Sequence, residues 1–116
     1  IQGATVSEKT YRIRGSITEE ETGRGISNLI VRAFDKDVAL DDNLGSATTG
    51  EDGEFEILFG EAQFQDLFET RPDLYLRVFD ASGERLILDT SDAVRWNASQ
   101  KEFYALQLPA SRLKGR

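Results

Sequence analysis

The chain lacks both cysteine and histidine in its 116 residues. Without cysteine it has no disulfide, no thiolate nucleophile and no sulfur-ligated zinc. Without histidine it has no Ser-His-Asp or Cys-His activation of a nucleophile, no imidazole-ligated zinc or iron, and no titrating switch near neutral pH. These two absences exclude most common enzyme sites. Because the sequence contains no other catalytic constellation, we predict that the chain is not an enzyme.

Long apolar runs and an excess of positive charge are also missing. No stretch approaches the roughly 18 apolar residues that mark a membrane span, and residues 1–9 have neither the basic start nor the apolar middle of a signal peptide. The 21 acidic residues outnumber the 14 basic ones and give a net charge of −7. Such a charge disfavours non-specific attraction to nucleic acid or to an anionic bilayer. We therefore expect no nucleic-acid partner and no membrane span, while the compartment stays open.

What the sequence does contain is the material of one folded domain. A length of 116 residues suits a single hydrophobic core. Seven Phe, three Tyr and one Trp supply bulky apolar groups that disordered chains lack. The chain is therefore expected to fold as one compact unit.

Apolar and polar residues alternate over several short segments, which is the period of half-buried β-strands. The alternation predicts that Phe55, Ile57 and Phe59 point into a core, and the segment Gly50–Gly53 before them is typical of a hairpin turn. Two more runs, 28–34 and 73–80, each place three aliphatic residues on one face. The expected strands are residues 10–17, 28–34, 44–49, 53–59, 73–80, 85–88 and 102–108.

One segment has a different period. Phe64, Leu67 and Phe68 are spaced i, i+3 and i+4, which marks one face of a short helix near residues 61–69, and Pro72 disfavours its continuation. Seven strands and one short helix predict an all-β, antiparallel β-sandwich. We assign residues 1–9 to an N-terminal extension, 10–108 to the sandwich and 109–116 to a C-terminal tail.

Five sequence pieces occur in an order that is typical of one family. They are Tyr11-Arg12-Ile13-Arg14-Gly15, the run Val31 to Asp37, Leu44-Gly45, Thr48 to Phe55, and Asp73-Leu74-Tyr75-Leu76-Arg77-Val78-Phe79-Asp80. With these pieces the chain resembles the transthyretin-like, or carboxypeptidase regulatory-like, β-sandwich domains of large bacterial proteins, including toxin-complex components. The resemblance covers residues 10 to 108 and implies a prealbumin-like sandwich.

The resemblance also implies a role. Such a domain is an accessory module whose partners are neighbouring domains of a parent polypeptide or another protein, and it favours a secreted or cell-surface location. Enzymes with similar sandwiches include hydroxyisourate hydrolases, which rely on histidine, and intradiol dioxygenases, which hold iron through histidine and tyrosine. Neither site can be built from this sequence.

Acidic residues crowd into the segment that follows the second expected strand. Calcium takes about 6 to 8 oxygen ligands, and four aspartates close together repel one another unless a cation neutralises them. The segment also looks locally like the calcium loop of C2 domains. Alternatively, Asp and Asn cap turns by accepting hydrogen bonds from nearby backbone amides. The candidate calcium ligands are Asp35, Asp37, Asp41, Asp42 and Asn43.

Two other functions are alternatives to a structural or binding module. Trp96 or exposed tyrosines could stack on sugar rings, as in a carbohydrate-binding module. Paired carboxylates of the acidic segment could act as general acid and base in a small hydrolase, although no second feature supports this reading. The sequence therefore favours a non-catalytic module, with carbohydrate binding as the first alternative.

Overall fold

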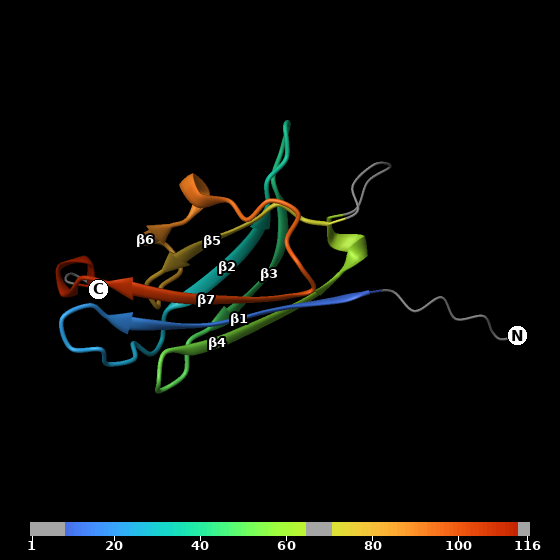
Figure 1. The fold of residues 1–116 in the computed structure, drawn as a ribbon. Helices are drawn as coiled ribbons and strands as arrows, with labels where there is room; N and C mark the ends of the chain where they lie inside the picture. Colours follow the sequence, from blue (N-terminus) through green and yellow to red (C-terminus); the bar gives the residue numbers. More distant parts are fainter. Residues whose placement is uncertain (1–8, 65–70, 114–116) are drawn as a thin grey trace, which may run out of the picture.

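The computed structural model describes residues 9–64 and 71–113 and shows two β-sheets that pack face to face (Figure 1). This confirms an all-β sandwich with seven strands in the expected order. The strands are β1 (Thr10–Glu19), β2 (Ile30–Asp35), β3 (Asp42–Thr48), β4 (Glu54–Gly60), β5 (Leu74–Phe79), β6 (Leu86–Asp89) and β7 (Lys101–Leu108).

One sheet has the strand order β4-β1-β7 and the other has the order β3-β2-β5-β6. Every pair is antiparallel except β1 and β7, which run parallel from Arg12 opposite Lys101 to Glu19 opposite Leu108. The prediction of a wholly antiparallel sandwich is therefore wrong at this pair. After β6 the chain crosses to the other sheet and enters beside β1 in the same direction, and side-chain alternation carries no information about strand direction.

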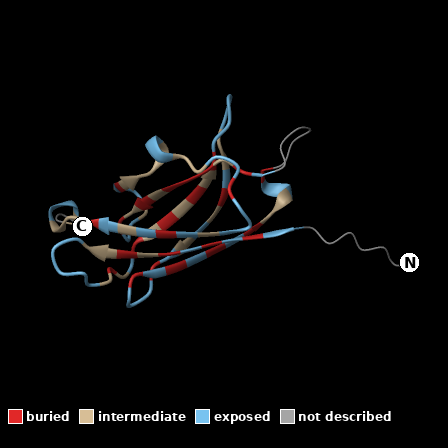
Figure 2. Ribbon diagram, in the orientation of Figure 1, coloured by how far each residue is buried: buried red, intermediate tan, exposed pale blue. Residues whose placement is uncertain are grey.

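The core lies between the two sheets and consists of the residues that the alternation predicted. In Figure 2, buried and exposed positions alternate along β1 and β4. Phe55, Ile57 and Phe59 are all buried, and the Tyr11 ring stacks on Phe59 with 5.2 Å between ring centroids. Each fully buried side chain of this kind stabilises the fold by about 1.5–3 kcal/mol. The hydrophobic core is therefore the main source of stability.

The expected helix near residues 61–69 has a partial counterpart. The chain forms a single 3₁₀ turn, η1 (Glu61–Gln63), in which the Gln63 side chain accepts a hydrogen bond of 2.7 Å from the backbone N–H of Gly60. Phe64 follows and is buried, whereas residues 65–70 lie outside the described residues. Within the described ranges, no helix is long and apolar enough to cross a membrane.

Residues 110–113, part of the expected C-terminal tail, form the 3₁₀ turn η3 (Ala110–Leu113). The Arg112 side chain donates a hydrogen bond of 2.8 Å to the carbonyl of Ile87 in β6, and the Arg85 side chain donates one of 2.9 Å to the carbonyl of Arg112. This part of the tail is therefore held against the sandwich.

Two loops meet closely at the end of the sandwich where β1 finishes. The backbone N–H of Ile17 donates to the carbonyl of Gly53, at 2.9 Å, and Ile26 N–H donates to the carbonyl of Ile17, at 3.0 Å. Gly53 has φ of +79°, and a Cβ atom at this position would lie 2.2 Å from the carbonyl oxygen of Ile17. Gly23 in the neighbouring loop has φ of +75°, but a Cβ there would have open space around it. A comparison of substitutions at Gly53 and Gly23 therefore separates the energetic cost of a positive φ from the cost of steric crowding.

Candidate functional site

The acidic segment forms the connection between β2 and β3, a hairpin that projects beyond one end of the sandwich (Figure 1). Asp35 ends β2, and Asp42 and Asn43 begin β3, with Asp35 and Asp42 directly opposite each other. Asp37 and Asp41 lie between the two strands. The hairpin therefore brings the five candidate residues to one end of the sheet, but not to one point.

Asp35 is separated from the others by the pleat of the sheet. It follows Val31 and Ala33 on the inward face of β2 and is fully buried. Its carboxylate accepts a hydrogen bond of 2.7 Å from the backbone N–H of Asp73, which precedes β5. This carboxylate therefore fastens the start of β5 to the end of β2.

Asp41 lies on the opposite face of the same sheet. Its Oδ2 accepts a hydrogen bond of 2.5 Å from the Tyr75 hydroxyl, and its Oδ1 accepts one of 2.9 Å from the backbone N–H of Asp37. Asp37 in turn accepts from the N–H of Val38 at 2.6 Å, and Asn43 Oδ1 accepts from the N–H of Gly45 at 2.9 Å. The side-chain oxygens of this loop thus hold backbone amides and one tyrosine.

The calcium site stays a prediction, and the hydrogen bonds of its candidate residues bear on the alternative, a capped turn. Among the described residues, no group of three or more acidic side chains is placed so that it could hold a metal ion. Asp35 points inward while Asp41 lies outward, and both oxygens of Asp41 accept hydrogen bonds. The hydrogen bonds favour the interpretation of the segment as a capped turn.

Calcium titration provides a direct check of this interpretation. We expect no saturable heat when calcium is titrated into the purified chain in a calorimeter, and no change in melting temperature at millimolar calcium. The side-chain oxygens of the loop already accept hydrogen bonds from backbone amides and from Tyr75, which shapes the turn without a cation. A saturable heat that disappears in the Asp37→Asn variant would instead show that the loop rearranges around the ion.

The Tyr75–Asp41 pair makes the stability of the hairpin depend on pH. Burial, followed by the hydrogen bond to Asp41, raises the pKa of Tyr75 to about 12. The same hydrogen bond from Tyr75, assisted by the Asp37 amide, lowers the pKa of Asp41 below its ordinary value. A carboxyl whose pKa is lowered by folding stabilises the folded state above its unfolded pKa, and this contribution is lost as the pH falls through the folded pKa.

Replacing Tyr75 by phenylalanine should therefore destabilise the chain in a pH-dependent way. At pH 7 we expect a loss of about 1.5–3 kcal/mol, the usual value for a hydrogen bond to a charged group. The difference between the wild type and Tyr75→Phe should begin to shrink below a pH of about 4, the ordinary pKa of an aspartate, and disappear as the pH falls through the lowered pKa of Asp41. Urea denaturation of both proteins between pH 2.5 and pH 7 measures this. A difference that does not change with pH would contradict the role of the charged pair.

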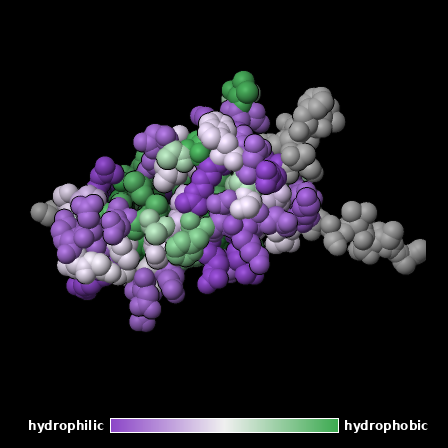
Figure 3. All heavy atoms as spheres, viewed as in Figure 1, coloured by the Kyte–Doolittle hydropathy of each residue, from purple (hydrophilic) through white to green (hydrophobic). Residues whose placement is uncertain are grey.

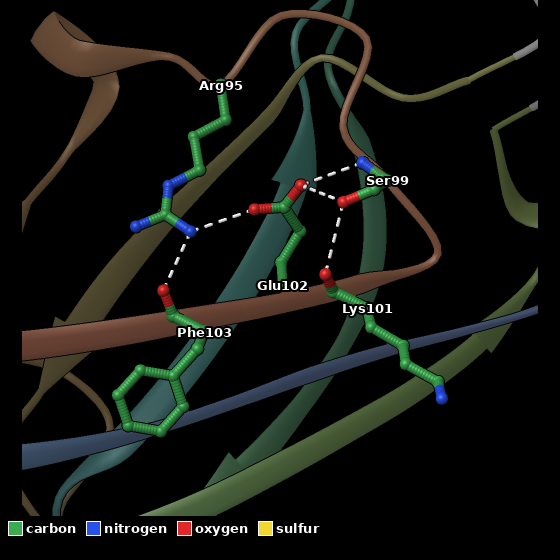
Figure 4. Close-up of polar contacts among 5 residues, drawn as sticks. All are labelled: Arg95, Ser99, Lys101, Glu102 and Phe103. Atoms are coloured by element: carbon green, nitrogen blue, oxygen red, sulfur yellow. Dashed lines mark hydrogen bonds and ion pairs between the residues drawn. The ribbon is translucent and has the colours of Figure 1, made fainter.

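A second polar cluster fixes the beginning of β7 (Figure 4). Glu102 accepts hydrogen bonds from Arg95 Nη1 at 2.9 Å and from the N–H of Ser99 at 2.7 Å. Arg95 Nη1 also donates to the carbonyl of Phe103 at 2.8 Å, and its guanidinium carbon lies 3.6 Å from the centre of the Tyr104 ring. Burial alone would raise the pKa of Glu102, but the bonds from Ser99 and Arg95 outweigh it and the pKa is lowered. The cluster therefore orients the residues of β7 that lie next to it.

Sequence reasoning missed the roles of Tyr75 and Arg95. Tyr75 meets a partner 34 residues away, Asp41, and Arg95 reaches the beginning of β7 only because the loop between them folds back on that strand. The sequence holds one signal for Tyr75. A tyrosine buried in a strand needs a hydrogen-bond partner for its hydroxyl, but the sequence does not say which residue that partner is. Trp96, named as a possible sugar-stacking residue, is 64% exposed, whereas all three tyrosines are buried.

Known proteins resemble this chain in their three-dimensional structure, but no sequence comparison finds a match. No family model and no curated protein matches the sequence. Part of a 9R-lipoxygenase from Cyanothece PCC8801 is similar, with a TM-score of 0.60 and 25% identity over 94% of this chain and 18% of that chain. The dioxygenase domain of a dioxygenase and carbohydrate-binding protein fusion from Streptomyces sp. SirexAA-E has a TM-score of 0.54 and 12% identity, over 92% of this chain and 84% of that chain.

A third similar structure is an (S)-allantoin synthase, with a TM-score of 0.52 and 14% identity over 87% of this chain and 40% of that chain. None of the three is described as a transthyretin-like domain, so membership of that family stays a prediction. The chain spans less than a fifth of the length of the lipoxygenase that it matches. At these identities, the comparisons with the dioxygenase domain and the synthase show a shared fold alone.

Proposed function

We propose that this chain is a non-catalytic β-sandwich module of a larger polypeptide, with a structural or binding role. The observation that carries the proposal is the relation to the lipoxygenase, in which nearly the whole of this chain corresponds to 18% of a much longer enzyme. A sandwich of the same size thus occurs as one part of a large protein. The transthyretin-like resemblance of the sequence points the same way.

The residues of the chain support a non-catalytic role. Dioxygenase domains share the fold, but this sequence has no histidine, and its three tyrosines are buried on three different strands. The Tyr75 hydroxyl is bonded to Asp41. No tyrosine therefore stands exposed as a ready ligand for iron.

Two measurements test the proposal. An antibody raised against this chain should detect, in the source cells, a polypeptide well above 13.0 kDa, the mass of the chain itself. The purified chain incubated with ferric iron should consume no oxygen with catechol. A native product of 13 kDa would contradict the modular role, and oxygen consumption would contradict the non-catalytic one.

Carbohydrate binding is a second candidate, favoured by the single exposed tryptophan. Trp96 follows Arg95, whose bonds to β7 hold the loop in place, so the ring is offered from a fixed position. A glycan array is the test. Binding that is lost in Trp96→Ala would establish this function, and an empty array would exclude it.

A further inference from the structure

The outer face of the sheet β4-β1-β7 carries a group of cationic and apolar side chains, which we call the basic patch. Arg12 lies directly opposite Lys101, and Arg14 lies directly opposite Phe103, so these four residues are neighbours on two adjacent strands. Leu58 of β4 lies opposite Arg12 on its other side. Lys101 and Phe103 both project away from the Arg95 cluster in Figure 4. The basic patch is therefore built on three strands of one rigid sheet.

The basic patch is open to solvent and only partly neutralised. Phe103 is 58% exposed and Leu58 is 53% exposed. Glu56 of β4 lies directly opposite Arg14 but pairs with Arg12, at 3.2 Å, and within the described part of the chain neither Arg14 nor Lys101 has an ion pair. Arg12, Arg14, Lys101 and Phe103 line a shallow hollow of about 250 Å³ together with one acid, Glu102, which is paired with Arg95. Unpaired cations around exposed apolar groups are unusual on a molecule whose net charge is −7, and they match an acidic, apolar partner.

The hairpin tip, residues 36–42, has the complementary composition. Val38 is fully exposed and Leu40 is 80% exposed, and the tip projects from the body as an apolar point in Figure 3. Asp37 and Asp41 flank the two aliphatic residues. Their carboxylates accept the backbone hydrogen bonds that shape the loop, so the aliphatic residues are presented on a defined turn. Two apolar side chains among aspartates thus form one compact protrusion.

The hairpin tip cannot reach the basic patch of its own molecule. The tip belongs to the sheet β3-β2-β5-β6, while the basic patch lies on the face of the other sheet that points away from the core. Any contact between them must join two molecules. We propose that the hairpin tip of one copy of this chain docks on the basic patch of a second copy, with Val38 and Leu40 against Phe103 and the aspartates facing Arg14 and Lys101.

The negative charge of the hairpin tip favours a second copy of the chain, and not a lipid surface, as its partner. The aspartates beside Val38 and Leu40 and the net charge of −7 oppose the approach of the tip to an anionic bilayer. A tip of this size buries little area, so the contact is weak and in rapid exchange. Exposed charges also make it sensitive to salt, since the Debye length shrinks from about 10 Å at 0.1 M to about 3 Å at 1 M ionic strength. Reciprocal docking would close a dimer, and one-way docking would form a chain of copies.

Nuclear magnetic resonance tests this contact with two variants. One variant retains only the basic patch, and the other retains only the hairpin tip. The isotope-labelled protein is Val38→Ser/Leu40→Ser, which has an intact basic patch and no apolar tip. The unlabelled titrant is Arg14→Glu, which has an intact tip and an altered patch. We expect saturable shifts at the amides of Arg12, Arg14, Lys101 and Phe103, with an affinity that falls several-fold at 0.5 M sodium chloride. Absence of shifts, or shifts confined to another surface, would overturn the proposal.

Matched controls separate docking from a general effect of charge. Adding Arg14→Glu to the labelled protein should abolish the shifts, whereas adding Arg24→Glu should preserve them, because Arg24 is exposed in a distant loop and the change in charge is the same. Shifts that persist when the titrant also lacks the apolar tip would overturn the proposal as well. If Arg14→Glu does not fold, Lys101→Glu alters the same patch. The proposal is independent of the parent polypeptide, so its failure would leave the modular function untouched.

Discussion

Replacing Gly53 by alanine should strongly destabilise the chain, and more than the same replacement at Gly23. The residue has φ of +79°, a region that costs an L residue about 1–2 kcal/mol. The new Cβ would also lie 2.2 Å from the carbonyl oxygen of Ile17, which is backbone and cannot rotate away. The two loops would have to separate, so the hydrogen bonds at Ile17 and Ile26 would be lost. We expect a total loss of about 4 kcal/mol or more.

Thermal and urea unfolding measure this loss, and Gly23→Ala is the matched control. Gly23 has nearly the same φ, +75°, but its added methyl group meets nothing within 4 Å. Its replacement should cost only the conformational part, about 1–2 kcal/mol. Equal losses for the two variants would show that crowding at Gly53 is relieved elsewhere and would contradict the close packing of the two loops.

Replacing Asp35 by alanine should produce the second largest effect. Its carboxyl group is fully buried and accepts a hydrogen bond of 2.7 Å from the N–H of Asp73, so the substitution removes this acceptor and leaves a space beside the core. Leaving the N–H without its partner costs about 1–3 kcal/mol, and the space adds to that loss. Because the bond joins β2 to the start of β5, we expect faster hydrogen exchange at Asp73 and Leu74 as well as lower stability.

Asp42→Ala is the appropriate comparison for this experiment. Asp42 lies directly opposite Asp35 but is only half-buried, and the structure gives its side chain no hydrogen bond among the described residues. Its replacement should change stability by about 0.5 kcal/mol or less. Similar losses for both variants would mean that the charge of the loop matters more than the bond to Asp73.

The strands and the core could be read from the sequence because both follow from a local period. Phe55, Ile57 and Phe59 are buried as their alternation predicts. The same rule also bears on the acidic segment, since Asp35 shares the spacing of Val31 and Ala33 and therefore points inward with them. Closeness along the chain suggested a common site for the aspartates. The pleat separates Asp35 from Asp41 and directs them to opposite faces.

Other features could not be read locally because they depend on pairing between distant segments. The parallel direction of β7 is set by how the chain crosses between sheets, and no residue of β7 encodes it. The basic patch likewise exists only because Arg12 and Arg14 of β1 lie beside Lys101 and Phe103 of β7. In the sequence these two pairs of residues are separated by most of the domain.

The parallel pairing of the first and last strands also has a mechanical consequence. Because β1 and β7 run in the same direction, Thr10 lies at one end of the sandwich and Leu108 lies at the other. A strand of ten residues spans roughly 33 Å. Within a longer polypeptide, such a domain would sit in line as a rigid spacer and hold its two flanking segments apart. Tension applied to the ends would shear the whole β1–β7 ladder at once instead of opening it bond by bond.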